Sequence, residues 1–195
     1  PPRGRVGRTG LGWGLALMFG MTSLVSYAMF TWLPKLMVEA GANPAFGGSM
    51  VALFSALGLV SSLGMPTLAA RLRNPFPLVL ACAASHLCGF AGLLWAPMAL
   101  ALLWVSLVGL GASTFPLALT LVNLRTRTPA GSAALSGFMQ GVGYGLSCLG
   151  PVLFGWLHEY SHGWELPFAF LALCVGVMLA GAWRACRPGL LEDRW

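Results

Sequence analysis

The sequence predicts an all-α membrane protein built from six transmembrane helices. Of its 195 residues, 57% are hydrophobic and only 8% are charged, and the mean hydropathy is +0.79. Soluble domains average about 25% charged residues, so this chain could not cover a water-facing surface. A bilayer core of about 30 Å needs about 20 apolar residues in a helix, and uncharged runs of that length recur along the chain.

Polar breaks between the apolar runs mark where each helix ends. After a basic cytoplasmic lead-in at 1–10, the breaks read "GANP", "RLRNP", "WAP", "RTRTPAG" and "HEYSHGWE", and a cytoplasmic tail follows at 188–195. The first apolar run continues to about Met37, which is too long for the core of a signal peptide. The bundle is expected over 11–187, with helices at about 12–38, 46–70, 76–95, 97–123, 131–157 and 164–186.

Basic residues are distributed unequally between the two sides of the predicted membrane. Ten of the eleven lie in the lead-in, after the second and fourth helices and at the end of the chain, and only Lys35 lies on the other side. The positive-inside rule therefore predicts a multi-pass protein of the inner (plasma) membrane with both termini in the cytoplasm. The net charge of +6 is interpreted as a topology signal, so we expect a lipid bilayer as partner and no nucleic acid.

Charged side chains are absent from the middle of every predicted helix, so ion coupling through an intramembrane carboxylate cannot be assigned. His86 is the one ionisable group near the middle of the membrane. It is a candidate proton relay, but we favour a neutral imidazole bonded to a carbonyl of a neighbouring helix. The five cysteines show no metal-ligand spacing, and neither a metal nor a cofactor is expected.

The stretch "LSGFMQGVGYGLSCLGPVLFGW" (135–156) combines glycines with hydrogen-bonding side chains. Small residues let membrane helices approach closely, so we expect one face to pack against a neighbour through Gly137, Gly141 and Gly145. The adjacent face carries Ser136, Gln140, Tyr144 and Ser147 or Cys148. Because an amide facing lipid is costly, Gln140 is expected to line a cavity or, alternatively, to bridge two helices.

Two other predicted helices carry polar groups at helical spacing. Ser23, Tyr27 and Phe30 or Thr31 share one face of the first helix. In the fourth helix, Pro116 favours a kink because it lacks an N–H, and polar residues surround it at Ser113, Thr114, Thr120 and Asn123. Together these faces indicate a polar pathway through the bundle.

An intramembrane serine protease of the rhomboid type is an alternative with six helices. "GASTF" (111–115) supplies the first part of a G-x-S-x-[GA] motif around Ser113 but ends in Phe. The later histidines, His158 and His162, lie in a polar connection rather than in the last helix. Since a serine nucleophile needs a base within hydrogen-bond reach, we expect no catalytic residue and no enzyme.

Three stretches, "FGMTSLVSYAMFTWLPKLMVEAG" (19–41), "FPLALTLVNLRT" (115–126) and "AALSGFMQGVGYGLSCLGPVLFGWLHE" (133–159), carry a family resemblance. They resemble the second half of a major facilitator superfamily transporter, in particular the cyanate/2-nitroimidazole transporter branch. The chain departs from the family pattern at "LAARLRNP", which lacks the Asp-Arg core of the superfamily's loop motif, and at Thr22, where a glutamine is expected.

The resemblance implies a secondary transporter that works by alternating access, with two six-helix halves around a midplane site for a small solute such as cyanate or a nitroimidazole-like compound. This chain would be the C-terminal half, and the N-terminal six-helix half would be its partner. The first residue is proline and the first methionine is Met18, so we expect a processed chain or a fragment. A half-size carrier or channel that acts as a dimer is the further alternative.

The resemblance also implies roles for individual residues. The expected substrate-lining residues are Ser23, Tyr27, Gln140 and Tyr144, with Trp32 and Asn123 as further candidates. The basic residues expected to set topology and to brace the cytoplasmic gate are Arg71, Arg73, Arg125 and Arg127.

Overall fold

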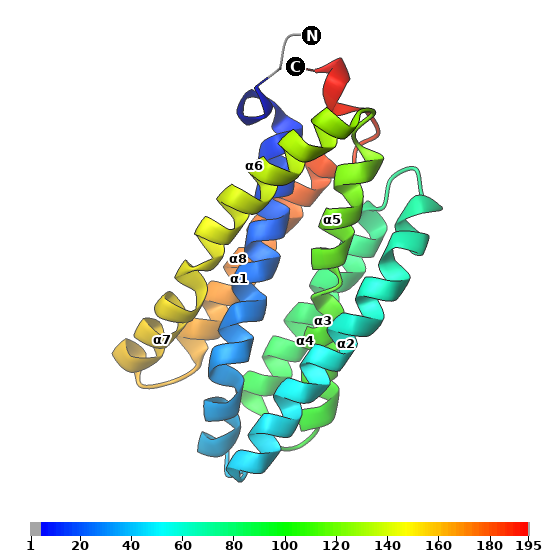
Figure 1. The fold of residues 1–195 in the computed structure, drawn as a ribbon. Helices are drawn as coiled ribbons and strands as arrows, with labels where there is room; N and C mark the ends of the chain where they lie inside the picture. Colours follow the sequence, from blue (N-terminus) through cyan, green and yellow to red (C-terminus); the bar gives the residue numbers. More distant parts are fainter. Residues whose placement is uncertain (1–4, 195) are drawn as a thin grey trace.

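The long helix α1 (Gly10–Glu39) runs through the middle of the bundle in the computed structural model, which describes residues 5–194 (Figure 1). It packs most extensively against α8 (Glu165–Ala185) and α6 (Pro129–Ser147). It also contacts α2 (Pro44–Ala70), α5 (Thr114–Leu124) and α7 (Leu149–Ser161). Its side chains are buried on nearly every side, among them Leu15, Phe19, Met29 and Leu33. A helix that is apolar all round in this way belongs to the core.

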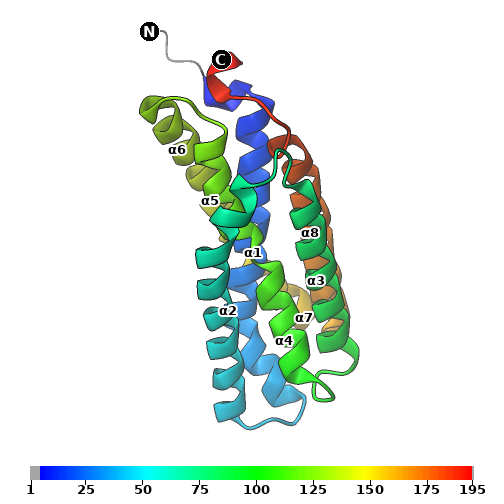
Figure 2. The same cartoon turned by 90° about the vertical axis from the view of Figure 1, so that its right-hand side faces the viewer.

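The other helices surround α1, with α2 and α5 to one side of it and α3 and α8 to the other in the turned view (Figure 2). Both ends of the described chain lie at the same end of the bundle (Figure 1). The remaining elements are η1 (Val6–Arg8), α2 (Pro44–Ala70), α3 (Phe76–Trp95), α4 (Ala101–Gly111), α5 (Thr114–Leu124), α6 (Pro129–Ser147), α7 (Leu149–Ser161), α8 (Glu165–Ala185) and η2 (Leu191–Asp193).

Prolines divide two of the predicted helices. Pro116 cannot donate to the carbonyl of Ala112, and the Phe115 N–H bonds that carbonyl instead at 3.0 Å, so the rod breaks between α4 and α5. Pro151 likewise cannot donate to the carbonyl of Ser147, and α6 gives way to α7 at Cys148. The predicted kink at Pro116 is therefore present, and a second break accompanies it.

Five helical stretches of the described chain are long and apolar enough to cross a membrane: α1, α2, α3, α4 with α5, and α8. This confirms the predicted all-α membrane class. The predicted fifth helix, at 131–157, corresponds to α6 followed by α7 and is not one of the five. Its content of glycine, serine and glutamine lowers its hydropathy.

Within the described residues, the face of α6 that was expected to pack against a neighbour contacts no other helix. A Cβ added at Gly137, Gly141 or Gly145 would meet no atom within 4 Å, so this face is open. The face that packs against α1 instead contains Leu135, Met139, Gly143 and Ser147. A close helix approach lies elsewhere, between α1 and α8, where a Cβ at Gly181 would lie 2.7 Å from the carbonyl oxygen of Gly14.

Candidate functional site

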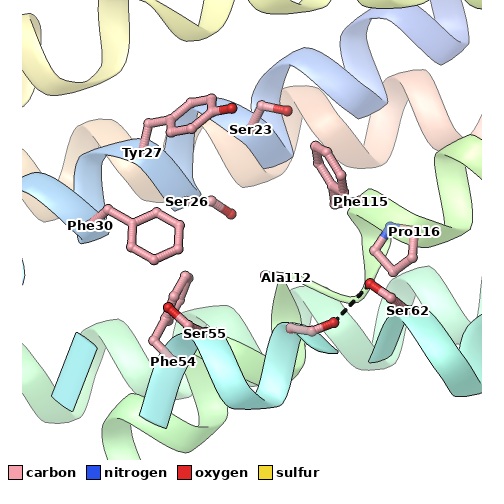
Figure 3. Close-up of a pocket in the computed structure, with 11 residues that line it drawn as sticks. Ser23, Ser26, Tyr27, Phe30, Phe54, Ser55, Ser62, Ala112, Phe115 and Pro116 are labelled. Carbon is pink, nitrogen blue, oxygen red and sulfur yellow. Dashed lines mark hydrogen bonds between the residues drawn. The ribbon is translucent and has the colours of Figure 1, made fainter. Parts of the chain in front are cut away.

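A pocket of about 280 Å³ opens between α1, α2 and the α4–α5 break (Figure 3). Helix α1 places hydroxyl groups on it through the i, i+3, i+4 spacing that puts residues on one face. Helix α2 adds further serines from across the pocket. The lining residues are Ser23, Ser26, Tyr27, Phe30, Phe54, Ser55, Gly58, Ser62, Ala112, Phe115 and Pro116.

Ser23 carries the buried hydroxyl of the pocket that forms no hydrogen bond within the described structure. Its Oγ is buried and forms no hydrogen bond, whereas Ser55 Oγ donates to the Val51 carbonyl at 3.0 Å and Ser62 Oγ donates to the Gly58 carbonyl at 2.9 Å. A buried hydroxyl without a partner costs free energy. Ser23 is therefore the group best placed to bond a bound molecule.

Aromatic rings form the walls of the pocket. Phe30 and Phe54 meet edge to face with centroids 5.0 Å apart, and Phe115 packs on Phe19 at 4.8 Å. None of the lining residues carries a formal charge. The site can therefore offer hydroxyl hydrogen bonds and ring faces to a small solute, and any compensation of a substrate's charge must come from outside this set.

Two buried hydroxyl pairs hold the helix break at the back of the pocket. Thr22 Oγ1 and Thr114 Oγ1 lie 2.7 Å apart and join α1 to α5. Ser61 Oγ and Ser113 Oγ are also 2.7 Å apart and join α2 to the break. Thr22, which departs from the family pattern, thus has a defined contact with the broken helix.

The structure brings some of the predicted lining residues together. Ser23 and Tyr27 both line the pocket. Tyr144 of α6 is not one of the residues that line the pocket, and its ring meets Phe19 edge to face at 5.1 Å. Gln140 lies outside the pocket: its amide donates to Ser136 Oγ at 2.7 Å on the same helix rather than to a second helix.

Trp32 and Asn123 lie elsewhere. The Trp32 indole donates to the carbonyl of Pro151 at 2.9 Å and so joins α1 to α7. Asn123 accepts from Ser132 Oγ at 3.2 Å and lines a shallow depression near the connection between α5 and α6. Neither residue faces the pocket between α1 and α2.

His86 does not make the hydrogen bond that we favoured. It is 1% exposed, and neither ring nitrogen has a partner among the described residues. The ring stacks on Phe90 with centroids 5.5 Å apart and packs against the backbone at Gly111. His86 does not line the pocket. The pocket therefore does not support a role for His86 as a proton relay.

The protease alternative lacks its base in the described part of the chain. Ser113 Oγ has the Ser61 hydroxyl as its partner, not a histidine. His158 stacks on Trp164 with centroids 3.7 Å apart and lies 3.5 Å from a carboxylate oxygen of Glu39. The residues needed for a serine nucleophile are therefore not assembled.

The predicted gate arginines lie at the end of the bundle that holds the termini. Arg125 is buried, and its guanidinium donates to the carbonyls of Ala185 and Cys186 at 3.2 and 2.8 Å. It thereby satisfies carbonyls that the end of α8 leaves without partners. Arg127 pairs with Asp193 at 3.2 Å, while Arg71 and Arg73 are exposed between α2 and α3.

Sequence reasoning missed the contribution of α2. Ser55, Gly58 and Ser62 follow one another at i, i+3 and i+7, which is a small, polar stripe on one helix face. That spacing was a usable signal. Without the fold, however, nothing distinguished these serines from others that bond their own helix carbonyls.

Comparisons with known proteins show transporters as relatives. The chain is 34% identical over 179 residues to the uncharacterized transporter YycB of Bacillus subtilis (strain 168), covering 91% of this chain and 44% of that protein. It is 35% identical over 177 residues to the cyanate transport protein CynX of Escherichia coli (strain K12), covering 90% and 46%. It is 32% identical over 167 residues to the 2-nitroimidazole transporter of the same strain, covering 85% and 42%.

No protein-family model matches the chain. The chain spans about half the length of the curated relatives it matches, or somewhat less. These three relatives are named as transporters and not as enzymes, which supports the expectation that the protein is not an enzyme. The resemblance predicted from the sequence motifs is thus confirmed: the chain is related to transporters of the cyanate/2-nitroimidazole branch.

Proposed function

We propose that this chain forms the C-terminal half of a secondary transporter that moves a small solute by alternating access. The observation that carries the proposal is the pocket beside α1, in which the buried Ser23 hydroxyl has no partner and Tyr27 stands one helical turn away. A buried hydrogen-bonding group without a protein partner, at the wall of a pocket, is expected at a ligand site. The relatedness to transporters supports the same function.

The substrate we propose is a small planar compound, such as cyanate or a nitroimidazole-like molecule. Relatives bear the names of both compounds. The hydroxyls of Ser23 and Tyr27 can donate to cyanate or nitro-group atoms, and Phe30, Phe54 and Phe115 offer ring faces to a flat molecule. The lack of a formal charge in this lining means that the other half of the transporter would supply any positive charge for an anion.

The partner we propose is a second six-helix unit that covers the open side of α6. Gly137, Gly141 and Gly145 stand in open space along one face of that helix, and small residues at this spacing allow another helix to approach closely in a membrane. The unit is the N-terminal half in our proposal. A dimer of two copies of this chain would cover the same face, and the mass of the purified protein distinguishes the two.

We propose an inner-membrane location with both termini in the cytoplasm. The described ends of the chain lie at one end of the bundle (Figure 1). Arg71 and Arg73 follow α2, and Arg125 and Arg127 follow α5. Lys35 lies at the far end of α1, after Pro34. This distribution supports the orientation that the positive-inside rule predicts.

Uptake by cells that express the full protein tests the function. Labelled cyanate and 2-nitroimidazole are the probes, and Ser23→Ala and Tyr27→Phe are the variants. Each variant should lower uptake about tenfold or more at an unchanged protein level, because loss of one buried hydrogen bond costs about 1–2 kcal/mol. Ser49→Ala is the matched control, since Ser49 is exposed and bonds its own helix at Ala45. Full uptake by both pocket variants would refute the assignment of the site.

A further inference from the structure

A hollow of about 450 Å³ at the end of the bundle that holds the termini is lined by Arg5, Arg8, Thr9 and Arg194. These residues come from the lead-in, from the start of α1 and from the end of the described chain. Figure 1 shows the two ends of the chain close to one another at this end. The fold therefore assembles three guanidinium groups from opposite ends of the sequence.

Backbone contacts fix the positions of these residues. Thr9 is buried, and its hydroxyl donates to the Val6 carbonyl at 2.7 Å and accepts from the Gly12 N–H at 3.0 Å. The Arg8 N–H bonds the Arg5 carbonyl at 2.9 Å, which closes the η1 turn. The lead-in is thus an ordered turn rather than a free extension of α1.

The tail that brings Arg194 to the hollow is also docked. The Leu191 N–H donates to the Arg125 carbonyl at 2.8 Å, and the Leu191 side chain is fully buried. The Arg194 guanidinium lies over Gly189, where a Cβ would stand 2.7 Å from one of its nitrogens. Gly189 has a φ of +139°, which only glycine adopts readily.

The acidic residues of the tail are engaged elsewhere. Glu192 Oε1 accepts from the N–H groups of Arg127 and Thr128 at 2.8 and 2.9 Å and from the Thr128 hydroxyl at 3.0 Å. Asp193 pairs with Arg127. Within residues 5–194, no carboxylate lies within 4.0 Å of a guanidinium nitrogen of Arg5, Arg8 or Arg194.

More positive charge surrounds the hollow. Arg184, in the last turn of α8, is close enough to Arg194 and to Arg187 for their like charges to interact. Helix α1 also begins here, and the N-terminus of a helix carries a partial positive charge. The hollow therefore has a strongly positive field that the described protein does not neutralise.

Exposed tryptophans show where the hollow lies relative to the bilayer. Trp13, in the first turns of α1, is 46% exposed and donates its indole N–H to the Gly7 carbonyl at 2.9 Å. Trp183, in the last turn of α8, is 53% exposed, and the Arg187 guanidinium lies 3.6 Å from its ring centroid. Tryptophans with one apolar and one polar side gather at the level of the lipid headgroups.

From these observations we propose that the hollow binds the phosphate of an anionic phospholipid headgroup. Guanidinium groups donate paired hydrogen bonds to phosphate oxygens, and three of them converge here at headgroup depth. A lipid brings its phosphate to this position at high local concentration, whereas a soluble anion must come from bulk water. The site is independent of the pocket beside α1, and it stands whether or not the proposed transport function does.

Thermal unfolding of the purified protein in detergent micelles tests the proposal, with phosphatidylglycerol or phosphatidylcholine titrated into the micelles. Phosphatidylglycerol should raise the unfolding temperature of the wild type in a saturable way, and phosphatidylcholine should not. The double variant Arg5→Gln/Arg8→Gln should need about tenfold or more phosphatidylglycerol for the same rise, given about 1 kcal/mol per arginine near an anionic lipid surface. Arg71→Gln/Arg73→Gln is the matched control, with the same loss of charge at the same end of the bundle but away from the hollow.

Three outcomes would overturn the proposal. The first is that phosphatidylglycerol does not raise the unfolding temperature of the wild type. The second is that the double variant and its control lose the response to phosphatidylglycerol equally. The third is that inorganic phosphate at the same concentration raises the unfolding temperature as much as phosphatidylglycerol does. The second outcome would indicate diffuse surface charge, and the third a site for soluble anions. If the double variant does not fold, Arg194→Gln carries the same test, because Arg194 lines the hollow through an exposed side chain.

Discussion

The hydroxyl oxygens of Thr22 and Thr114 lie 2.7 Å apart, although the two residues are 92 positions apart in the sequence. Both side chains are buried. The bond joins the central helix α1 to α5 where the α4–α5 rod is broken. The helix ends at that break lack part of the hydrogen bonding of a continuous helix. We therefore infer that the Thr22–Thr114 hydrogen bond holds the start of α5 against α1.

Thr22→Val should lower the stability of the protein. The Thr114 hydroxyl would lose its partner on α1 and keep only its 3.3 Å bond to the Gly111 carbonyl. The net loss of one buried hydrogen bond costs about 0.5–1.5 kcal/mol. Thermal unfolding in detergent measures the effect. The double variant with Thr114→Val should be less destabilised than the sum of the two single variants, and strict additivity would show that the two hydroxyls do not interact.

Arg125→Met should loosen the end of α8. The guanidinium donates to the carbonyls of Ala185 and Cys186, and the change leaves these carbonyls without that donor. We expect faster amide hydrogen exchange around 182–186 and a lower unfolding temperature. Arg127→Met serves as the control, since its ion pair with Asp193 is exposed and such pairs contribute about 0–1 kcal/mol. Equal effects in both variants would contradict the bracing role.

The tail should undock in acid through Glu192. Burial opposes ionisation of this carboxyl, but hydrogen bonds from the N–H groups of Thr128 and Arg127 outweigh burial and hold the pKa of Glu192 below its ordinary value of 4.5. A lowered pKa in the folded state means that the contribution to docking is complete above pH 4.5 and disappears as the pH falls through the folded-state pKa.

Amide exchange at Leu191, corrected for the intrinsic effect of pH, measures this docking because its N–H bonds the Arg125 carbonyl. Protection should be high at pH 6 and should decrease in acid below pH 4.5. Glu192→Gln should weaken the protection at pH 6 and remove its pH dependence. Persistence of the acid transition in Glu192→Gln would assign it to another group.

Gly181→Ala should disrupt the contact of α1 with α8, and Gly141→Ala should be tolerated. The added methyl at Gly181 would lie 2.7 Å from the backbone oxygen of Gly14, whereas the one at Gly141 would meet no atom within 4 Å. We expect a loss of about 1–3 kcal/mol or more for the first and a small gain from helix propensity for the second. Unfolding temperatures in detergent measure both.

A bulkier change at Gly141 separates packing within this chain from packing against a partner. Gly141→Leu should not lower the unfolding temperature of this half, but it should lower uptake by the full transporter, because the proposed partner half would meet the added side chain. Normal uptake by that variant would show that the open face of α6 is not covered in the working protein.

The membrane class and helix ends could be predicted because the apolar runs and their polar breaks are written locally in the sequence. The position of Ser23 and Tyr27 on one face of α1 could be predicted from their i, i+4 spacing. The orientation of α6 could not, because its glycines fit a packing face and an open face equally well, and only the position of α1 decides between them. The partners of His86 and Gln140 depend on which backbone and side-chain groups lie nearby, and that is not encoded in their own helices.

The prolines at 116 and 151 have a mechanical consequence. At each break the backbone hydrogen bonds of the rod are already interrupted, so bending there stretches fewer of them than bending an unbroken helix does. Helix α1, by contrast, is continuous over its 30 residues despite Pro34. Helix α1 is therefore stiffer than the two interrupted segments beside it, α4–α5 and α6–α7. The pocket lies beside the break at Pro116, so a rotation of α5 there would change its width.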